Sequence, residues 1–379
     1  MIKYAPHGSE AFNAKVEESL AYIAARFDTL FSRNDLIALV LGGGYGRKEG
    51  GVLKSAEGEK LYNDLDFFVI SKALSLRKKA SISRDLKNLH QELSEEFGID
   101  VDFAEPKSIP EISQAPLTLM MYDLQHGYTV IWGNKHALQN LPRQAATKLS
   151  ISEAVKLLLN RGMGLYFAKE HLKREDYHLH IDFINRNIHK AYQAMAEAIL
   201  IGEGKYHWSV FERMKRIAKL DISSYSSHNA LKQLMQTAMV FKLQPHIPDE
   251  DSATLLDRVT EAITMFEEVY YKVWAAYFGV SKLDLKSYLN LLASNKDQAY
   301  SVMSLAKNFA LNMRDCGLKQ ANLNEYIKYP RYRLFYTLPW LLFKADMAPE
   351  MVASMLGIQE CRERLGLEKR YVELWQRYN

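Results

Sequence analysis

The spacing of apolar residues changes near residue 150, and this change most constrains how the chain can fold. Before it, short apolar runs of strand length alternate with stretches of helical spacing. After it, the convincing patterns all have helical spacing, and no run reads as a strand. We therefore expect an α+β protein, with an N-terminal mixed β-sheet and flanking helices followed by a large all-α C-terminal region.

The N-terminal part predicts four strands and three helices. Apolar residues at helical spacing give the longer helices, and short apolar runs bounded by glycine or proline give the strands. In chain order, the predicted elements are a helix over 9–33, strands over 36–44 and 64–70, a helix over 74–97, a strand over 99–106, a short helix before Gly127, and a strand over 128–132. The charged segment VLKSAEGEKLY, before the second strand, is expected to form an extended turn.

The C-terminal part predicts helices only. The clearest helical spacing covers residues 151–172, 183–202, 207–219, 229–242 and 252–279. One boundary is expected between residues 133 and 150, and a second where proline and acidic residues interrupt the pattern at 244–251. These breaks predict three domains, 1–145, 146–245 and 246–379.

Composition bears on location and partners. The formal net charge is only +4 and the charges are interspersed, which argues against a nucleic-acid partner. Two cysteines, Cys316 and Cys361, form no cluster of metal or disulfide type. The first residues lack the layout of a secretion signal, and no apolar run approaches the roughly 20 residues that a membrane span needs. We expect a cytoplasmic protein without a membrane span.

A glycine-rich segment, GGGYGRKEGG over 42–51, directly follows the first strand. Glycine lets the backbone turn sharply and approach a ligand closely, and amides exposed in such a turn hold phosphate oxygens. Arg47 would add a charge-assisted contact to the same phosphates. The segment has neither the Gly-Lys-Ser/Thr of a P-loop nor the spacing of a dinucleotide-binding turn.

Two pairs of aspartates stand on the predicted strands. Alternation places Asp64 and Asp66 on one face of the second strand. Asp100 and Asp102 share one face of the third strand in the same way. Neighbouring carboxylates repel each other unless a cation lies between them, and Mg²⁺ beside a triphosphate is the usual solution. A third carboxylate would complete a site for two Mg²⁺ ions, with Mn²⁺ as the substitute.

These pieces together resemble the polymerase-beta-like nucleotidyltransferase superfamily. The resemblance rests on Gly43–Glu49 (GGYGRKE), on Asn63–Asp66 (NDLD) and on an aspartate of a later strand. The loop is most similar to the GGYGRGE loop of the uridylyl- and adenylyltransferases that modify nitrogen-signalling proteins. The likeness covers roughly residues 35–135. Lys48 departs from it, because relatives often have glycine at that position.

The resemblance implies a nucleotidyltransferase fold and a role for each motif residue. Gly43 and Gly44 would contact the triphosphate, and Asp64 and Asp66 would bind metal. Asp102 would be the third carboxylate and metal ligand, because the family's third acid precedes apolar strand residues such as Phe103; Asp100 remains the alternative.

In this superfamily a helical domain often follows the catalytic one and closes the cleft. The resemblance assigns this role to residues 146–245. Lys190 is our preferred contact to the triphosphate from that region, ahead of Asn187 and Arg161. Residues 246–379 would shape the acceptor site or form a homodimer. Within them, the basic and aromatic stretch Tyr326–Lys344 is expected to be packed inside the protein rather than to bind nucleic acid.

We therefore expect a magnesium-dependent enzyme that transfers a nucleoside monophosphate from a nucleoside triphosphate to a hydroxyl of a small molecule or a protein, releasing pyrophosphate. The first alternative is a non-catalytic nucleotide-binding or regulatory protein, antitoxin-like, that keeps the fold. The second is a nucleotidyltransferase acting on RNA ends, against which the weak net charge counts.

Overall fold

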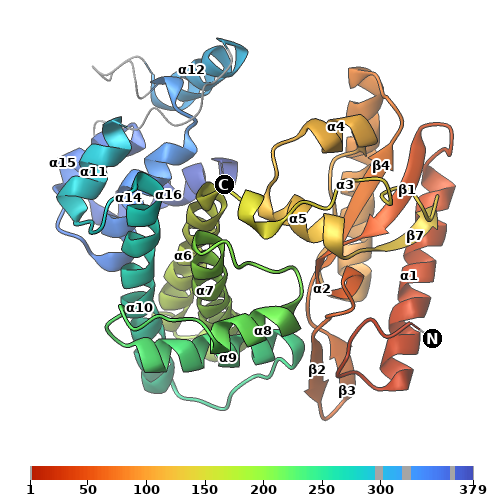
Figure 1. Ribbon diagram of the computed structural model, residues 1–379, viewed down its shortest axis with the longest axis horizontal. Helices are drawn as coiled ribbons and strands as arrows, with labels where there is room; N and C mark the ends of the chain where they lie inside the picture. The colour runs from red at the N-terminus through yellow and green to blue at the C-terminus, as the bar shows by residue number, and fades with distance from the viewer. Residues whose placement is uncertain (1, 295–301, 318–325, 359–362, 379) are drawn as a thin grey trace. The chain divides into compact units, whose positions relative to one another are not determined.

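The computed structural model describes residues 2–294, 302–317, 326–358 and 363–378. The chain forms two compact units (Figure 1). The sheet unit consists of the chain up to Glu153 together with Glu203–Ser223 and His228–Ile247. The helical unit consists of Ala154–Gly202, Ser224–Ser227 and the described residues from Pro248 onward. The expected combination of a small N-terminal mixed sheet and a large helical C-terminal region is confirmed.

A mixed β-sheet forms the centre of the sheet unit. Its strands are β1 (Leu36–Leu41), β4 (Leu65–Ser71), β5 (Val101–Phe103), β6 (Lys107–Ser108) and β7 (Thr129–Gly133). They lie in the order β5-β4-β1-β7, and β6 also pairs with β4. β1 runs antiparallel to β4 and β7, whereas β5 and β6 run parallel to β4. This arrangement leaves β5 at one edge of the sheet.

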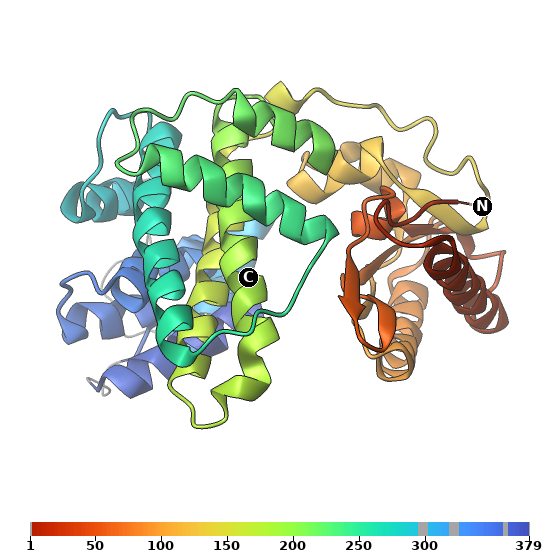
Figure 2. The same ribbon diagram turned by 90° about the horizontal axis from the view of Figure 1, so that it is seen from below.

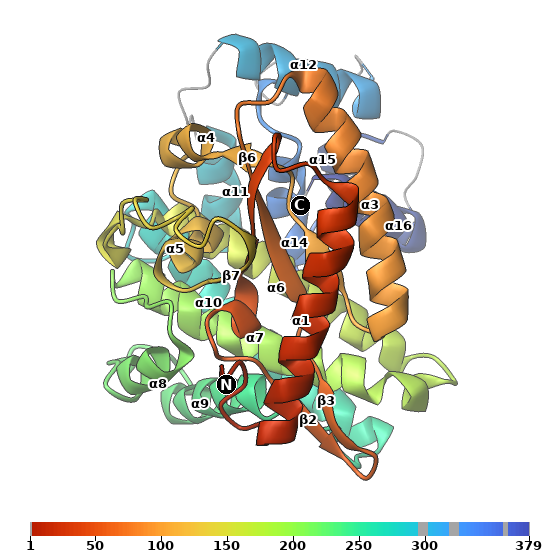
Figure 3. The ribbon, with the colours of Figure 1, turned by 90° about the vertical axis from the view of Figure 1, so that its right-hand side faces the viewer.

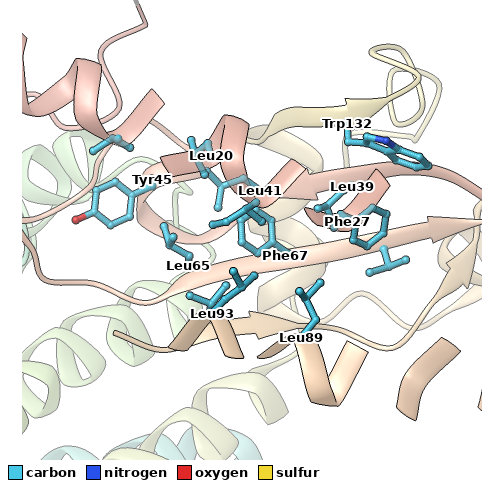
Figure 4. Close-up of a cluster of buried hydrophobic side chains, with 14 of the residues drawn as sticks. Leu20, Phe27, Leu39, Leu41, Tyr45, Leu65, Phe67, Leu89, Leu93 and Trp132 are labelled. Carbon is cyan, nitrogen blue, oxygen red and sulfur yellow. The ribbon is translucent and has the colours of Figure 1, made fainter. Parts of the chain in front are cut away.

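Helices cover both faces of this sheet. On one face, α1 (Glu10–Leu30) and α3 (Leu76–Phe97) lie across the strands (Figure 3). Their apolar residues recur every three to four positions, so one stripe of each helix packs on the sheet. Figure 4 shows this core, in which Leu65 and Phe67 of β4 meet Leu89 and Leu93 of α3. A second core on the other face includes Ile112 of α4 (Ile109–Gln114) and Leu124 of α5 (Leu119–His126).

The segment predicted as an extended turn is instead a β-hairpin. It consists of β2 (Val52–Ser55) and β3 (Gly58–Leu61), which pair antiparallel with each other. Its tip is exposed and its strands carry mostly charged or polar residues. Only Val52 and Leu61, paired at its base, pack on the core, and strands this short with one apolar contact each show no alternation of apolar and polar residues. The hairpin follows the glycine-rich segment, whose first part forms the single helical turn α2 (Gly43–Gly46).

The predicted long helices of the C-terminal part are confirmed. The helical unit contains α6 (Ile151–Leu172, from residue 154), α7 (Ile181–Gly202) and α10 (Ser252–Phe278), and α7 packs directly against α10 (Figure 2). Two further predicted helices, α8 (Val210–Ala218) and α9 (His228–Leu243), belong to the sheet unit. The remaining helices that the structure describes are α11 (Leu285–Ser294), α12 (Val302–Cys316), α14 (Arg331–Phe343), α15 (Pro349–Leu356) and α16 (Arg364–Tyr378).

The basic and aromatic stretch around α14 is packed inside the helical unit, as expected. Leu334 through Leu342 are all buried. Arg333 is buried as well and donates hydrogen bonds to Asn312 Oδ1 at 3.0 Å and Met355 O at 2.9 Å. These groups therefore hold the helices together rather than face a ligand. Across the described ranges, no helix has both the length and the apolar character needed to span a bilayer.

Candidate functional site

The glycine-rich turn lies against the start of β4. Gly42 N–H donates to Asp66 O at 2.8 Å, which ties the turn to the strand that carries the first aspartates. Gly43 has a φ of +58°, a conformation that glycine adopts without strain. A Cβ atom at Gly43 would lie 2.1 Å from Asp66 Oδ2. Glycine is therefore required at this position both by its backbone conformation and by the carboxylate beside it.

The rest of the turn is fixed by close packing. Tyr45 is fully buried, and its Oη donates to Gly51 O at 2.6 Å. A Cβ atom at Gly46 would lie 2.2 Å from Leu41 O, so this glycine allows the turn to approach the end of β1. Lys48 has a φ of +63°. This left-handed conformation is one that glycine adopts without strain, so Lys48 occupies a position that glycine would suit.

The aspartates lie on the face of the sheet that sequence alternation predicted. Leu65, Phe67 and Val69 of β4 point into the core under α1 and α3. Asp66 alternates with them and so lies on the opposite face, together with Phe68 and Ile70. Asp64 immediately precedes β4 and is half-buried, as is Asp66. The alternation predicted for Asp66 against Leu65, Phe67 and Val69 is confirmed.

The register between β4 and β5 distinguishes the two later aspartates. Asp66 is the direct partner of Asp102 in this parallel pair. Residues in register on adjacent parallel strands point to the same face, so their carboxylates are neighbours. Asp100 precedes β5, and its carbonyl oxygen accepts from Leu65 N–H at 2.9 Å. Asp102, the preferred residue, is thus the one beside Asp66.

The surroundings of Asp102 oppose its ionisation, mainly through desolvation. Partial desolvation raises the pKa of Asp102 above its usual value, and the carboxylates of Asp100 and Asp64 raise it further, while His90 lowers it. Asp102 and Asp64 therefore interact as like charges. A cation bound between these groups would relieve their repulsion.

The donor chemistry of these aspartates fits Mg²⁺. Within the described ranges, no three histidine, cysteine, aspartate or glutamate side chains come together closely enough to hold a metal ion by themselves. Mg²⁺, however, is commonly bound by one or two carboxylates, with waters and substrate phosphates completing its six ligands. The neighbouring carboxylates of Asp66 and Asp102, with Asp64 two positions before Asp66, match that type of site.

Arg47 lies in an internal ion-pair network. Its Nη1 is 3.1 Å from Asp123 Oδ2 on α5, and its Nε is 3.8 Å from Glu49 Oε2. Only 8% of the Arg47 side chain is exposed. Glu49 is buried too and accepts from Ser209 Oγ at 2.6 Å and Val210 N at 3.0 Å, at the start of α8. A phosphate contact from Arg47 remains a prediction.

Sequence reasoning missed the partners in this network. The partners Asp123, Ser209 and Val210 belong to no recognised motif. The nearest in sequence, Asp123, is 76 residues beyond Arg47. The clue in the sequence was that the loop contains Arg and Glu two positions apart beside a buried strand. Buried charges of opposite sign are normally paired. That reasoning predicts internal partners but cannot name them.

We expect the Glu49→Gln substitution to destabilise the protein. It keeps the shape of the side chain but removes the charge that accepts two hydrogen bonds at the start of α8 and pairs with Arg47. Hydrogen bonds to a charged group contribute about 1.5–3 kcal/mol each, so we expect a loss of roughly 2 kcal/mol. Urea unfolding measures it. Glu57→Gln, the same change at an exposed carboxylate that pairs with Lys60, should cost far less, because exposed ion pairs contribute little; equal losses would contradict the assigned role of the Glu49 charge.

Lys190 belongs to a different compact unit from the other candidate residues. It is on α7 of the helical unit, where its side chain is half-buried, whereas Gly43, Gly44 and the aspartates belong to the sheet unit. The contact of Lys190 with a nucleotide therefore remains a prediction. The division into domains 1–145, 146–245 and 246–379 also remains a prediction. The structure groups α8 and α9 with the sheet unit and α7 with the helical unit.

A pocket of about 220 Å³ opens beside Asp102. Its walls are one face of α3 and the end of β5, with Ser83, Leu86, Lys87, His90, Asp102, Phe103 and Glu105 as lining residues. His90 was not among the predicted site residues. Its spacing of seven from Ser83 places both on one face of α3, but the sequence alone does not show that this face borders Asp102.

Comparison of the chain with protein-family models, with curated proteins and with solved structures found no match. The case for a function therefore rests on the geometry of the sheet unit and on the resemblance of its motifs.

Proposed function

We propose that the protein is a magnesium-dependent nucleotidyltransferase. It transfers a nucleoside monophosphate from a nucleoside triphosphate to a hydroxyl group of a small molecule or a protein. The observation that carries this proposal is the convergence of three sequence-distant groups: Gly43 packs against the carboxylate of Asp66, and Asp66 pairs in register with Asp102. A glycine turn that brings bare backbone to an acidic pair suits a triphosphate accompanied by a divalent cation.

The reaction exchanges one phosphorus–oxygen bond for another. The acceptor oxygen forms a bond to the α-phosphorus, the bond from that phosphorus to the bridging oxygen breaks, and pyrophosphate leaves. The acceptor hydroxyl loses its proton in the same step. Mg²⁺, when bound, would supply positive charge to the attacking and leaving oxygens.

The chain's own residues would position the reactants. Asp64, Asp66 and Asp102 would hold the cation on one face of the sheet. Backbone at Gly43 and Gly44, the half-buried members of the turn, would lie along the phosphates. Asp102, at the edge of the sheet and more exposed than Asp66, would receive the acceptor proton through its carboxylate.

The direct test follows the label of an α-labelled nucleoside triphosphate. The purified protein is incubated with Mg²⁺, each of the four triphosphates in turn and a desalted or crude cell extract, with EDTA in place of Mg²⁺ as the control. We expect label to appear in a new species with one triphosphate, together with released pyrophosphate. Magnesium-dependent binding without transfer would favour the regulatory alternative. Strongly salt-dependent labelling of RNA would favour the RNA-end alternative.

A further inference from the structure

The outer edge of β5 is closed by side chains of α3. Val101 N–H donates to Ser94 Oγ at 3.0 Å. Val101 O lies 3.1 Å from His90 Nδ1. A carbonyl oxygen can only accept a hydrogen bond, so the hydrogen of the His90 ring is on Nδ1. Ser94 and His90 thus satisfy the two backbone groups that the edge position of Val101 leaves without a strand partner.

His90 also contacts the next residue of β5. The same Nδ1 atom lies 3.4 Å from Asp102 Oδ1. The Nδ1–H group thus donates to Val101 O and lies within ion-pair distance of the Asp102 carboxylate. Ser94, by contrast, contacts β5 by accepting a hydrogen bond from the Val101 amide. The two edge contacts thus differ in whether they reach the carboxylate.

Asp102 is the aspartate of the candidate site that most needs such a contact. Its side chain is 60% exposed, and rotation about the bond to a carboxylate has a broad, weakly restricted profile. A carboxylate in water at the edge of a sheet has no fixed direction unless a neighbour holds one oxygen. His90 lies between Asp102 and the body of α3, and both residues line the same pocket.

We propose that His90 is a positioning residue that directs the carboxylate of Asp102 toward its task at the candidate site. The inference rests on the proposed function, because it takes Asp102 to be the third carboxylate. A group that fixes the direction of a metal-binding side chain typically changes metal affinity or activity by about 10- to 100-fold when it is removed.

Three variants separate this role from the closure of the strand edge. His90→Leu removes the donor, His90→Asn places an amide N–H near the position of Nδ1, and Ser94→Ala removes only the other edge contact. Mn²⁺ affinity is measured by electron paramagnetic resonance without nucleotide, with Asp102→Asn as the reference for complete loss. The transfer reaction gives kcat and KM for the triphosphate.

We expect His90→Leu to weaken Mn²⁺ binding and to lower kcat by about 10- to 100-fold, with KM for the triphosphate nearly unchanged. His90→Asn should restore most of both quantities, and Ser94→Ala should match the wild type. Wild-type values for His90→Leu, or equal losses in His90→Leu and Ser94→Ala, would overturn the inference, since the contact would then only close the edge.

The two readouts keep this inference distinct from the proposed function. A wild-type protein that binds Mn²⁺ through Asp102 but transfers no nucleotide would refute the proposed enzyme, while the Mn²⁺ affinities of the His90 variants still decide the positioning role. A wild-type protein whose Mn²⁺ binding equals that of Asp102→Asn, and that transfers nothing, would overturn both.

Discussion

The Asp66→Asn variant is expected to fold normally and to lose nucleotide transfer by at least about a thousandfold. Asparagine keeps the size of the side chain beside Gly43 but removes the negative charge next to Asp102. Removing a single group that stabilises charge in a transition state typically costs about 10²–10³ in rate, and loss of a cation ligand adds to that effect. The measurement is the rate of label transfer from the triphosphate, with circular dichroism to confirm folding.

The matched control for this substitution is Asp28→Asn. Asp28 lies at the end of α1, where it pairs with Arg33, outside the candidate site. The same change of charge there should leave the transfer rate within about threefold of the wild type, because asparagine keeps an oxygen that can accept from Trp132 Nε1 and the position lies outside the candidate site. Full transfer by a well-folded Asp66→Asn protein would remove Asp66 from the mechanism.

The Gly43→Ala variant is expected to impair the site by geometry rather than by charge. The new methyl group would lie 2.1 Å from Asp66 Oδ2, so either the turn or the carboxylate must move. The backbone at φ +58° adds roughly 1–2 kcal/mol of strain for alanine. Misplacement of a reacting group by about 1 Å can cost a hundredfold in rate, so we expect a loss of about that size in kcat/KM.

Gly98→Ala separates the strain from the clash. Gly98 ends α3 with a φ of +64°, but a Cβ atom there would have no neighbour within 4 Å. Both variants should therefore lose a similar backbone contribution to the free energy of unfolding, as measured in urea, while only Gly43→Ala loses transfer. A Gly43→Ala protein with unchanged kcat/KM would show that the position of the turn against Asp66 is unimportant for the reaction.

The sequence predicted those parts of the fold that bury one regular apolar face. Helices such as α3 and α10 show a stripe at helical spacing, and β4 shows the alternation that places Asp66 opposite Phe67. The hairpin of β2 and β3 was missed because its exposed strands carry no such pattern. β6 was missed because its two residues are too few to show any period. Local pattern predicts an element only where one of its faces is buried.

Some contacts of the candidate site could likewise be predicted from local pattern, and others could not. Asp64 and Asp66 stand two positions apart, so the face that they share followed from local alternation. The contact of Gly43 with Asp66 depends on the pairing of β1 with β4. Which of Asp100 and Asp102 lies beside Asp66 depends on the register between β4 and β5, which no local pattern encodes. The pairing of Arg47 with Asp123, and of His90 with Asp102, depends on how helices pack on the sheet. Long-range packing of this kind cannot be derived from periodicity.

The discontinuous chain path of the sheet unit has a consequence for synthesis. Glu49 finds its hydrogen-bond donors at Ser209 and Val210, on a segment that joins the sheet unit only after α7 has been made. A nascent chain ending at Glu153 would contain all strands of the five-stranded sheet and every candidate aspartate, yet the carboxylate of Glu49 would lack the start of α8. The glycine turn therefore reaches its final support only when the ribosome has passed residue 210, and a fragment cut near residue 150 would be an incomplete domain.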